Sequence, residues 1–227
     1  MSVWTPHYFR LFLSHVATYK VTAQQLKVAL NFYNISCFVA HADIKPTKAW
    51  QDEIEEALRT MEAMAALLTP DFHESNWTDQ EVGFAMGRDI LVIPLRSEQN
   101  PYGFIGKYQG YAIRGKLVSE VAEDIVSILA AHQSTRLRMA QALVRRLEES
   151  STWESSKKTM TLLEECVQFD QDLLDRMETT IEDNSQVHDA WGVPERIQTL
   201  ITKFGEKKRA VKSTKRLRSK PQKGHQV

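Results

Sequence analysis

The segment DILVIPL, residues 89–95, decides the class of fold. It is apolar at consecutive positions, which is typical of a strand buried on both faces of a sheet. Three further short runs share this character: YFRLFLSH (8–15), ISCFVA (35–40) and AMAALLT (63–69). The last run would also suit a helix, but Pro70 ends it and the alternation of elements requires a strand there. These runs predict the strands of a parallel sheet.

Four other segments repeat apolar residues at helical spacing: 21–34, 50–61, 75–87 and about 116–131. In the first, Thr22 and Gln25 have the spacing of a capping box. Before the second, Pro46 breaks the chain and Thr47 is a candidate N-cap. Strands that alternate with helices predict an α/β domain, a flavodoxin-like three-layer fold with a central parallel sheet and helices on both faces.

The sequence changes character after this domain. Residues 133–204 are highly charged, show no strand pattern, and have helical spacing in 136–149 and 156–181. Ser151–Thr152 and Gly192–Val193–Pro194 are expected to divide them into two or three helices. We expect a small α-helical extension, packed on the first domain or flexibly joined to it. The predicted organisation is therefore an α/β domain over 1–132, a helical extension over 133–204 and a tail over 205–227.

A net charge of zero conceals an uneven distribution of charge. From Lys203 onward there are ten Lys and Arg against one acid, Glu206, so this part has a charge of +9 and the rest −9. The polar, basic composition of residues 205–227 predicts disorder. Residues 205–227 have no aromatic residues to stack on bases, so nucleic acid is not expected as a partner. A solvated tail, or a tether to the acidic body, is the expectation.

Several classes of protein are excluded by missing patterns. There is no apolar run long enough for a membrane span and no secretory signal, and the two cysteines, Cys37 and Cys166, are isolated. A soluble cytoplasmic protein is expected. The GxxxxGK[ST], GxSxG, HExxH, paired CxxC and GxGxxG patterns are absent, so no metal site and no bound cofactor are predicted.

Open α/β sheets bind ligands at the carboxyl ends of their strands, and three loops are expected to meet there. Their polar and aromatic residues are Ser14, His15, Asp43, Lys45, Trp50, Trp77 and Glu81. Two tryptophans, hydroxyl groups, and a helix N-terminus that favours anions would suit a ligand with a base and a phosphate. The residues alone leave other roles open: Trp50 as a core anchor, Asp43 as a loop cap, and Glu81 as an exposed helix acid.

Four motifs, in their order and separation, resemble the bacterial Toll/interleukin-1 receptor (TIR) domain over residues 8 to about 130. They are FLSH (12–15), CFVAHADIKPTKAWQDEIEEAL (37–58), LLTPDFHESNWTDQEVGFAMG (67–87) and VIPL (92–95). In that family a WxxxE pattern, here Trp77 and Glu81, supplies the catalytic glutamate of members that cleave NAD+. The resemblance implies that Glu81 is catalytic and that Trp77 stands beside it. The expected substrate contacts are Trp77 and, from their place in the loops at the carboxyl ends of the strands, Ser14, His15, Asp43 and Trp50.

The family's BB loop, here about residues 41–49, helps protomers associate and gates the nucleotide pocket. Many relatives have an acid directly after the second strand and an apolar residue followed by glycine later in the loop. This chain has Ala40–His41, then Asp43, then Pro46–Thr47 without a glycine. The resemblance therefore predicts the fold, but it does not define the ligand contacts of this loop.

The implied reaction requires one carboxylate. Cleavage of the nicotinamide–ribose bond passes through an oxocarbenium-like transition state, and the cationic nicotinamide leaves as a neutral molecule without a general acid. Ionised Glu81 would stabilise the developing charge, while packing against Trp77 would raise its pKa. Expected products are nicotinamide with ADP-ribose or a cyclic ADP-ribose isomer, in antiphage defence or immune signalling. We expect the protein to self-associate through its TIR domain, and we expect an effector protein to bind the product. The alternative to an NAD+-cleaving enzyme is a non-enzymatic TIR adaptor that binds other TIR domains.

Overall fold

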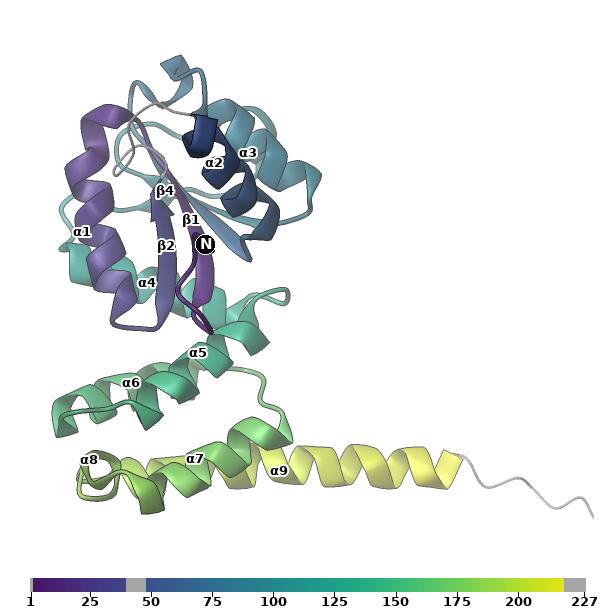
Figure 1. The fold of residues 1–227 in the computed structure, drawn as a ribbon. Coiled ribbons are helices and arrows are strands. Elements are labelled where there is room, and N and C mark those ends of the chain that lie inside the picture. The colour runs from purple at the N-terminus through teal and green to yellow at the C-terminus, as the bar shows by residue number, and fades with distance from the viewer. Residues whose placement is uncertain (1, 40–47, 219–227) are drawn as a thin grey trace, which may run out of the picture.

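The computed structural model describes residues 2–39 and 48–218, with side chains for 2–39 and 51–205. Strands and helices alternate through the first part of the chain (Figure 1). In chain order they are β1 (Phe9–Ser14), α1 (Lys20–Asn31), β2 (Ile35–Val39), α2 (Lys48–Thr60), β3 (Ala63–Leu68), α3 (Thr78–Gly87), β4 (Leu91–Arg96), β5 (Tyr111–Ala112) and α4 (Val118–Ala131). The predicted α/β class is confirmed, since the four predicted strands correspond to β1–β4.

Among the described residues, five strands form a parallel sheet in the order β2-β1-β3-β4-β5. Alternate residues of each strand face opposite sides. Leu11 and Leu13 pack with α1 and α4 in one cluster, whereas Phe12 packs with α2 and α3 in another. This produces the three layers visible in Figure 1. Burial on both faces explains why the strand sequences are apolar at consecutive positions.

The predicted capping box at Thr22 and Gln25 is wrong. α1 begins at Lys20, and its N-cap residue Tyr19 makes no side-chain capping bond. A 3-10 turn, Ala17–Tyr19, leads directly into the helix, so its first turn precedes the proposed cap. Thr47 lies outside the described residues. The two-residue strand β5 was not predicted, because it is too short to produce an alternating pattern.

The extension contains more helices than the two or three predicted. Its described residues form α5 (Arg136–Glu148), α6 (Trp153–Glu165), α7 (Gln171–Asp183), α8 (Ser185–His188) and α9 (Val193–Arg218). The additional breaks occur at capping residues, because polar side chains there accept hydrogen bonds from the backbone of the next helix. Asp170 accepts from Leu173 N, and Asn184 accepts from Gln186 N.

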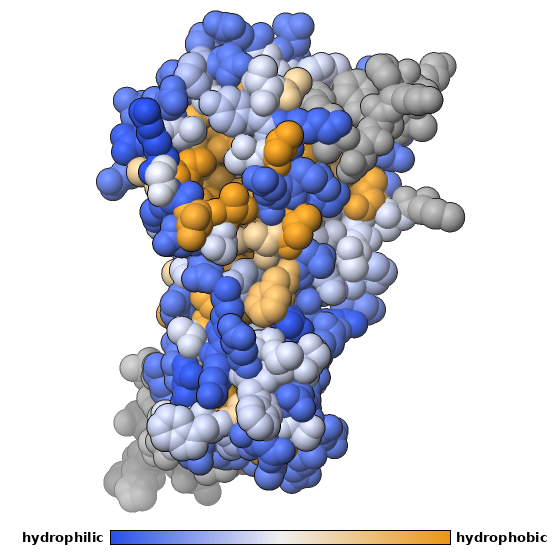
Figure 2. Space-filling model, turned by 90° about the vertical axis from the view of Figure 1, so that its left-hand side faces the viewer, coloured by the Kyte–Doolittle hydropathy of each residue, from blue (hydrophilic) through white to orange (hydrophobic). Residues whose placement is uncertain are grey.

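The extension packs against the amino edge of the sheet rather than being joined only by a linker. One described apolar cluster runs from β1 through α4 and α5 to Phe204 of α9. Arg138 of α5 donates to Glu62, which precedes β3, at 2.6 Å, and Asn34, which precedes β2, donates to Glu149 at 3.1 Å. Figure 1 shows α5–α9 stacked at this edge. Figure 2 shows apolar side chains concentrated on the α/β domain above them.

The disorder predicted for the tail does not extend to all of it. The backbone is helical from Val193 through Arg218, so residues 205–218 continue α9. Lys, Arg, Glu and Ala are strong helix formers, and residues 206–218 contain no glycine or proline. In Figure 1 this end of α9 projects beyond the other helices. Of the helices that the structure describes, none has the length and hydropathy needed to cross a bilayer.

Candidate functional site

Glu81 and Ser14 meet at the carboxyl edge of the sheet. Ser14 is the last residue of β1, and Glu81 lies in the first turn of α3; their relative exposures are 0% and 2%. The Ser14 Oγ donates a hydrogen bond of 2.6 Å to Glu81 Oε2. The strand order reverses between β1 and β3, which is the topological switch point where α/β sheets bind ligands. A buried carboxylate at this position is therefore a strong candidate for chemistry.

Burial dominates the electrostatics of Glu81. Removal from water raises the pKa of its carboxyl to about 7, and the hydrogen bond from Ser14 opposes this rise. The other carboxylate oxygen, Oε1, is also buried and has no hydrogen-bond partner among the described side chains and backbone. Such an oxygen is costly to leave unsatisfied, so it is available to accept a hydrogen bond from a ligand.

A groove between α2 and α3 reaches Glu81. Its volume is about 500 Å³. Its described lining is Gln51, Ile54, Glu55, Leu58 and Arg59 from α2, with Trp77, Gln80, Glu81 and Phe84 from the start and body of α3. Trp77, Glu81 and Phe84 share one face because they are separated by four and three residues. Near the far ends of both helices, the Arg88 guanidinium donates to the Leu58 carbonyl.

Trp77 borders this groove and a second, smaller hollow. It is the N-cap residue of α3, its side chain is half-buried, and its carbonyl accepts the Glu81 N–H at 2.9 Å. The second hollow, of about 390 Å³, is also lined by Asp71. Hydroxyls of Thr69 and Thr18 donate to Asp71 at 2.9 and 3.0 Å, and the Thr69 bond is the largest cause of its lowered pKa. An ionised Asp71 therefore lines the hollow that Trp77 also borders.

The structure brings some of the predicted site residues together, while others lie away from the groove or outside the described residues. Ser14, Trp77 and Glu81 form one unit. His15 is 1% exposed and its Nδ1 lies 3.3 Å from the Leu13 carbonyl, but it is not part of the described groove lining. Asp43 lies outside the described residues. The backbone of Trp50 belongs to α2, while its side chain is outside the described part of the chain.

The sequence did not identify several residues of the site. Phe84 and Arg59 line the groove, and Asp71 lines the adjoining hollow. Phe84 could have been found, because it continues the face of Trp77 and Glu81 by one helical turn. Arg59 could not, since it depends on how α2 packs beside α3. Across the residues with described side chains, no cluster of three or more His, Cys, Asp or Glu is placed to hold a metal ion.

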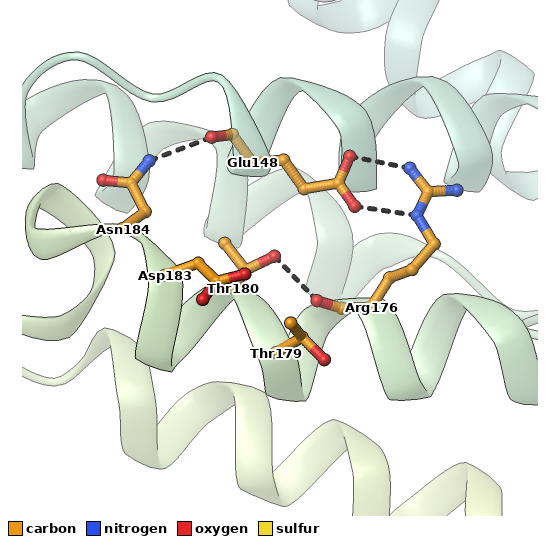
Figure 3. A pocket seen from close by; sticks show the side chains of 6 residues that line it. All are labelled: Glu148, Arg176, Thr179, Thr180, Asp183 and Asn184. Atoms are coloured by element: carbon orange, nitrogen blue, oxygen red, sulfur yellow. Dashed lines mark hydrogen bonds and ion pairs between the residues drawn. The ribbon is translucent and has the colours of Figure 1, made fainter.

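A hollow of about 370 Å³ in the extension has a structural explanation (Figure 3). Arg176 of α7 donates two hydrogen bonds of 2.7 Å to Glu148 of α5. Asn184 donates to the Glu148 carbonyl at 2.9 Å, and the Thr180 hydroxyl to the Arg176 carbonyl at 2.7 Å. These groups satisfy one another and join α5 to α7, so the hollow is not a candidate for the principal site.

Comparison with family models gives a match to the family described as TIR domain, over residues 11–129. The match covers more than half of the chain, extends from β1 to α4, and includes Ser14, Trp77 and Glu81. The helical extension lies outside it. Comparisons with curated proteins and with solved structures give no match.

Proposed function

The chain belongs to the TIR domain family, and on that premise we propose that it cleaves the nicotinamide–ribose bond of NAD+ with Glu81 as the catalytic carboxylate. The observation that supports this most directly is the placement of Glu81. Its carboxylate is buried at the switch point of the sheet, borders the groove between α2 and α3, and has one oxygen without a partner among the described residues. A solvated helix acid would have none of these properties.

In the proposed hydrolysis the bond between ribose C1′ and the nicotinamide nitrogen breaks. Its electron pair stays with the ring, which leaves as neutral nicotinamide. Ionised Glu81 accepts a hydrogen bond from a ribose hydroxyl at Oε1 and stabilises the positive charge that develops on the ribose. A water oxygen then bonds to C1′ and its proton passes to solvent, giving ADP-ribose. When an adenine nitrogen attacks C1′ instead, a cyclic isomer and a released proton result.

The walls of the groove suit the rest of the substrate. Trp77 and the partly exposed Phe84 provide apolar surface on both sides of Glu81 for a planar ring. Arg59, in an exposed ion pair of 3.2 Å with Glu55, provides a cation on the opposite wall for a diphosphate. His15, Asp43 and Trp50 remain proposed contacts, based on their place in the loops that follow the first and second strands. In this proposal NAD+ is the substrate, and the reaction needs no bound cofactor.

The proposed biological role is depletion of NAD+ or production of a nucleotide signal in antiviral defence. TIR domains commonly self-associate, so we expect cleavage to increase with protein concentration. An effector protein that reads a cyclic product, and a cytoplasmic location, belong to the same proposal.

The test is to incubate the purified full chain with NAD+ over a range of protein concentrations, with and without a macromolecular crowder. Chromatography of the products should show nicotinamide together with ADP-ribose or a cyclic isomer, with a rate that rises more steeply than protein concentration. The absence of product under every condition would favour the alternative, a non-enzymatic adaptor that binds other TIR domains.

A further inference from the structure

We propose that Ser14 is a positioning residue for Glu81: its hydroxyl fixes one carboxylate oxygen, Oε2, so that the other, Oε1, is presented to the substrate. This inference rests on the proposed function, in which Glu81 acts on NAD+. It changes the expected role of Ser14, which its place at the carboxyl end of the first strand made a predicted substrate contact. The difference matters because the two roles have different effects on kinetics.

The backbone on both sides of the Ser14–Glu81 bond is held firmly. Ser14 ends β1, which is paired with β2 on one side and β3 on the other, and its register partner in β3 is Ala66. On the α3 side, the Thr78 hydroxyl donates to the Phe72 carbonyl, and the Glu81 N–H donates to the Trp77 carbonyl. Neither partner can move far without disrupting these bonds, so the contact defines the direction of the carboxylate.

The hydrogen-bonding capacity of the two groups then determines their roles. A serine hydroxyl has one hydrogen, and here it is used in the 2.6 Å bond to Glu81 Oε2. That bond fixes the rotation of the carboxyl group about its last torsion angle. Oε1 is buried, has no partner in the described part of the chain, and belongs to a side chain that lines the groove. Ser14 itself is fully buried and is absent from that described lining.

The same bond affects the charge of Glu81. Burial raises the carboxyl pKa to about 7, and the Ser14 hydroxyl is the one influence that lowers it. Loss of the hydroxyl should therefore raise the pKa further and reduce the ionised fraction at neutral pH. A mispositioned and largely protonated carboxyl would affect the chemical step much more than the binding of substrate.

The experiment compares the full-length wild type with Ser14→Ala, Ser14→Thr and a matched control, Ser36→Ala. Ser36 is a buried serine on the neighbouring strand β2 whose hydroxyl accepts from Thr5 N, far from the carboxyl edge. Nicotinamide release is measured as kcat and KM across pH. We expect Ser14→Ala to lower kcat at neutral pH by roughly tenfold or more, as for hydrogen bonds to charged groups. Its pH midpoint should move upward, with KM little changed.

Ser14→Thr retains the hydroxyl and should keep the wild-type midpoint, and so should Ser36→Ala. A Ser14→Ala enzyme with unchanged kcat and midpoint would overturn the proposal. An increase in KM at constant kcat would also overturn it, because it would identify Ser14 as a substrate contact. Should Ser14→Ala not fold, Ser14→Cys fills the same space with a weaker donor and should give a smaller shift in the same direction.

Direct titration of the Glu81 carboxyl by carbon-13 NMR separates this inference from the proposed function. If the wild type releases no nicotinamide, the proposed function is wrong. The titration still tests whether the Ser14 hydroxyl forms its hydrogen bond to Glu81. A higher Glu81 pKa in Ser14→Ala than in wild type and Ser36→Ala supports positioning by Ser14. Equal pKa values in all three proteins would contradict it.

Discussion

At the scale of single residues, Glu81 is a carboxylate whose environment favours the neutral form while the proposed reaction requires the charged form. Its side chain is almost fully buried, and the hydroxyl of Ser14 is the one described group that donates to it. The resulting pKa of about 7 leaves a substantial ionised fraction at neutral pH. The site thus retains a reactive charge at a cost in stability, which is common at active sites.

The rate of nicotinamide release is expected to depend on the ionisation of Glu81. Because the ionised form is required, kcat/KM for nicotinamide release should rise with pH and level off above about pH 7, the pKa of Glu81 in the free protein. The midpoint for kcat should lie lower, since the cationic nicotinamide ring of bound NAD+ favours the carboxylate. Steady-state rates across pH provide the check. Rates that fall as pH rises through this range would show that protonated Glu81 is the active form.

The free energy of unfolding is also expected to depend on the ionisation of Glu81. The folded-state pKa of Glu81 is raised above the unfolded value, so the folded state holds a proton that the unfolded state has lost between about pH 4.5 and 7. Stability contributed by the protonated carboxyl should therefore fall as pH rises through this window, by about 3 kcal/mol in total. Glu81→Gln does not titrate.

The measurement is urea unfolding of the wild type and Glu81→Gln at about pH 4 and about pH 8. Other carboxyls titrate equally in both proteins and cancel in the comparison. The variant should gain stability relative to the wild type at the higher pH by up to about 3 kcal/mol. A difference that does not depend on pH would mean that Glu81 titrates normally.

The sequence predicted part of this site. Helical spacing placed Trp77 and Glu81 on one face, which the structure confirms. By spacing alone, however, an ordinary exposed helix acid was the favoured interpretation of Glu81, whereas its side chain is buried. The contact with Ser14 joins residues 67 positions apart. It depends on the pairing of β1 with β3 and on how α3 packs against them, so no local pattern could reveal it. The roles of Asp43 and Trp50 stay predictions.

At the scale of elements, α3 positions Trp77 and Glu81. It does so with a glycine, Gly83, in its interior, where glycine destabilises a helix relative to alanine. A methyl group at Gly83 would contact nothing within 4 Å, whereas at Gly110 it would lie 2.9 Å from the ring of Pro101. Gly83→Ala should therefore stabilise the protein by about 0.5–1 kcal/mol through helix propensity. Gly110→Ala should destabilise it by about 1–3 kcal/mol, as overpacking does.

Urea unfolding of both variants tests this pair. If the Gly83→Ala variant is less stable than the wild type, the space beside Gly83 is not open in solution and the added methyl group meets another group there. An unaffected Gly110→Ala would show that the loop before β5 moves away from Pro101 readily.

Prediction was most successful for elements with a strong pattern. β1–β4 were predicted because each is a short apolar run between turn signals. β5 has two residues and no pattern, and α1 begins before its proposed capping box because a 3-10 turn precedes it. In the extension, apolar spacing identified helical segments, but the breaks at Asp170 and Asn184 depend on single capping side chains, which are common in loops as well.

At the scale of the whole molecule, the extension and the sheet share one apolar cluster, while the candidate site lies at the opposite edge of the sheet. Removal of residues 133–227 would expose the face of α4 that packs against α5 and α6. A fragment of residues 1–132 is expected to unfold at a lower temperature or to aggregate. A chain truncated after Phe204 retains the described cluster and should match the full chain.

Thermal unfolding and nicotinamide release of both truncated chains check this prediction. A fragment of residues 1–132 as stable as the full chain would mean that the extension is an independent unit. Loss of activity after truncation at Phe204 would assign a functional role to residues 205–227.

The most direct test of the central claim is nicotinamide release by the full chain compared with Glu81→Gln. The substitution preserves the size of the side chain and an oxygen that can accept from Ser14, while it removes the negative charge. With both proteins folded, shown by equal circular dichroism and cooperative unfolding, the wild type should release nicotinamide from NAD+ and the variant should release none above background. Turnover by Glu81→Gln at the wild-type rate would contradict the assignment of Glu81 as the catalytic carboxylate.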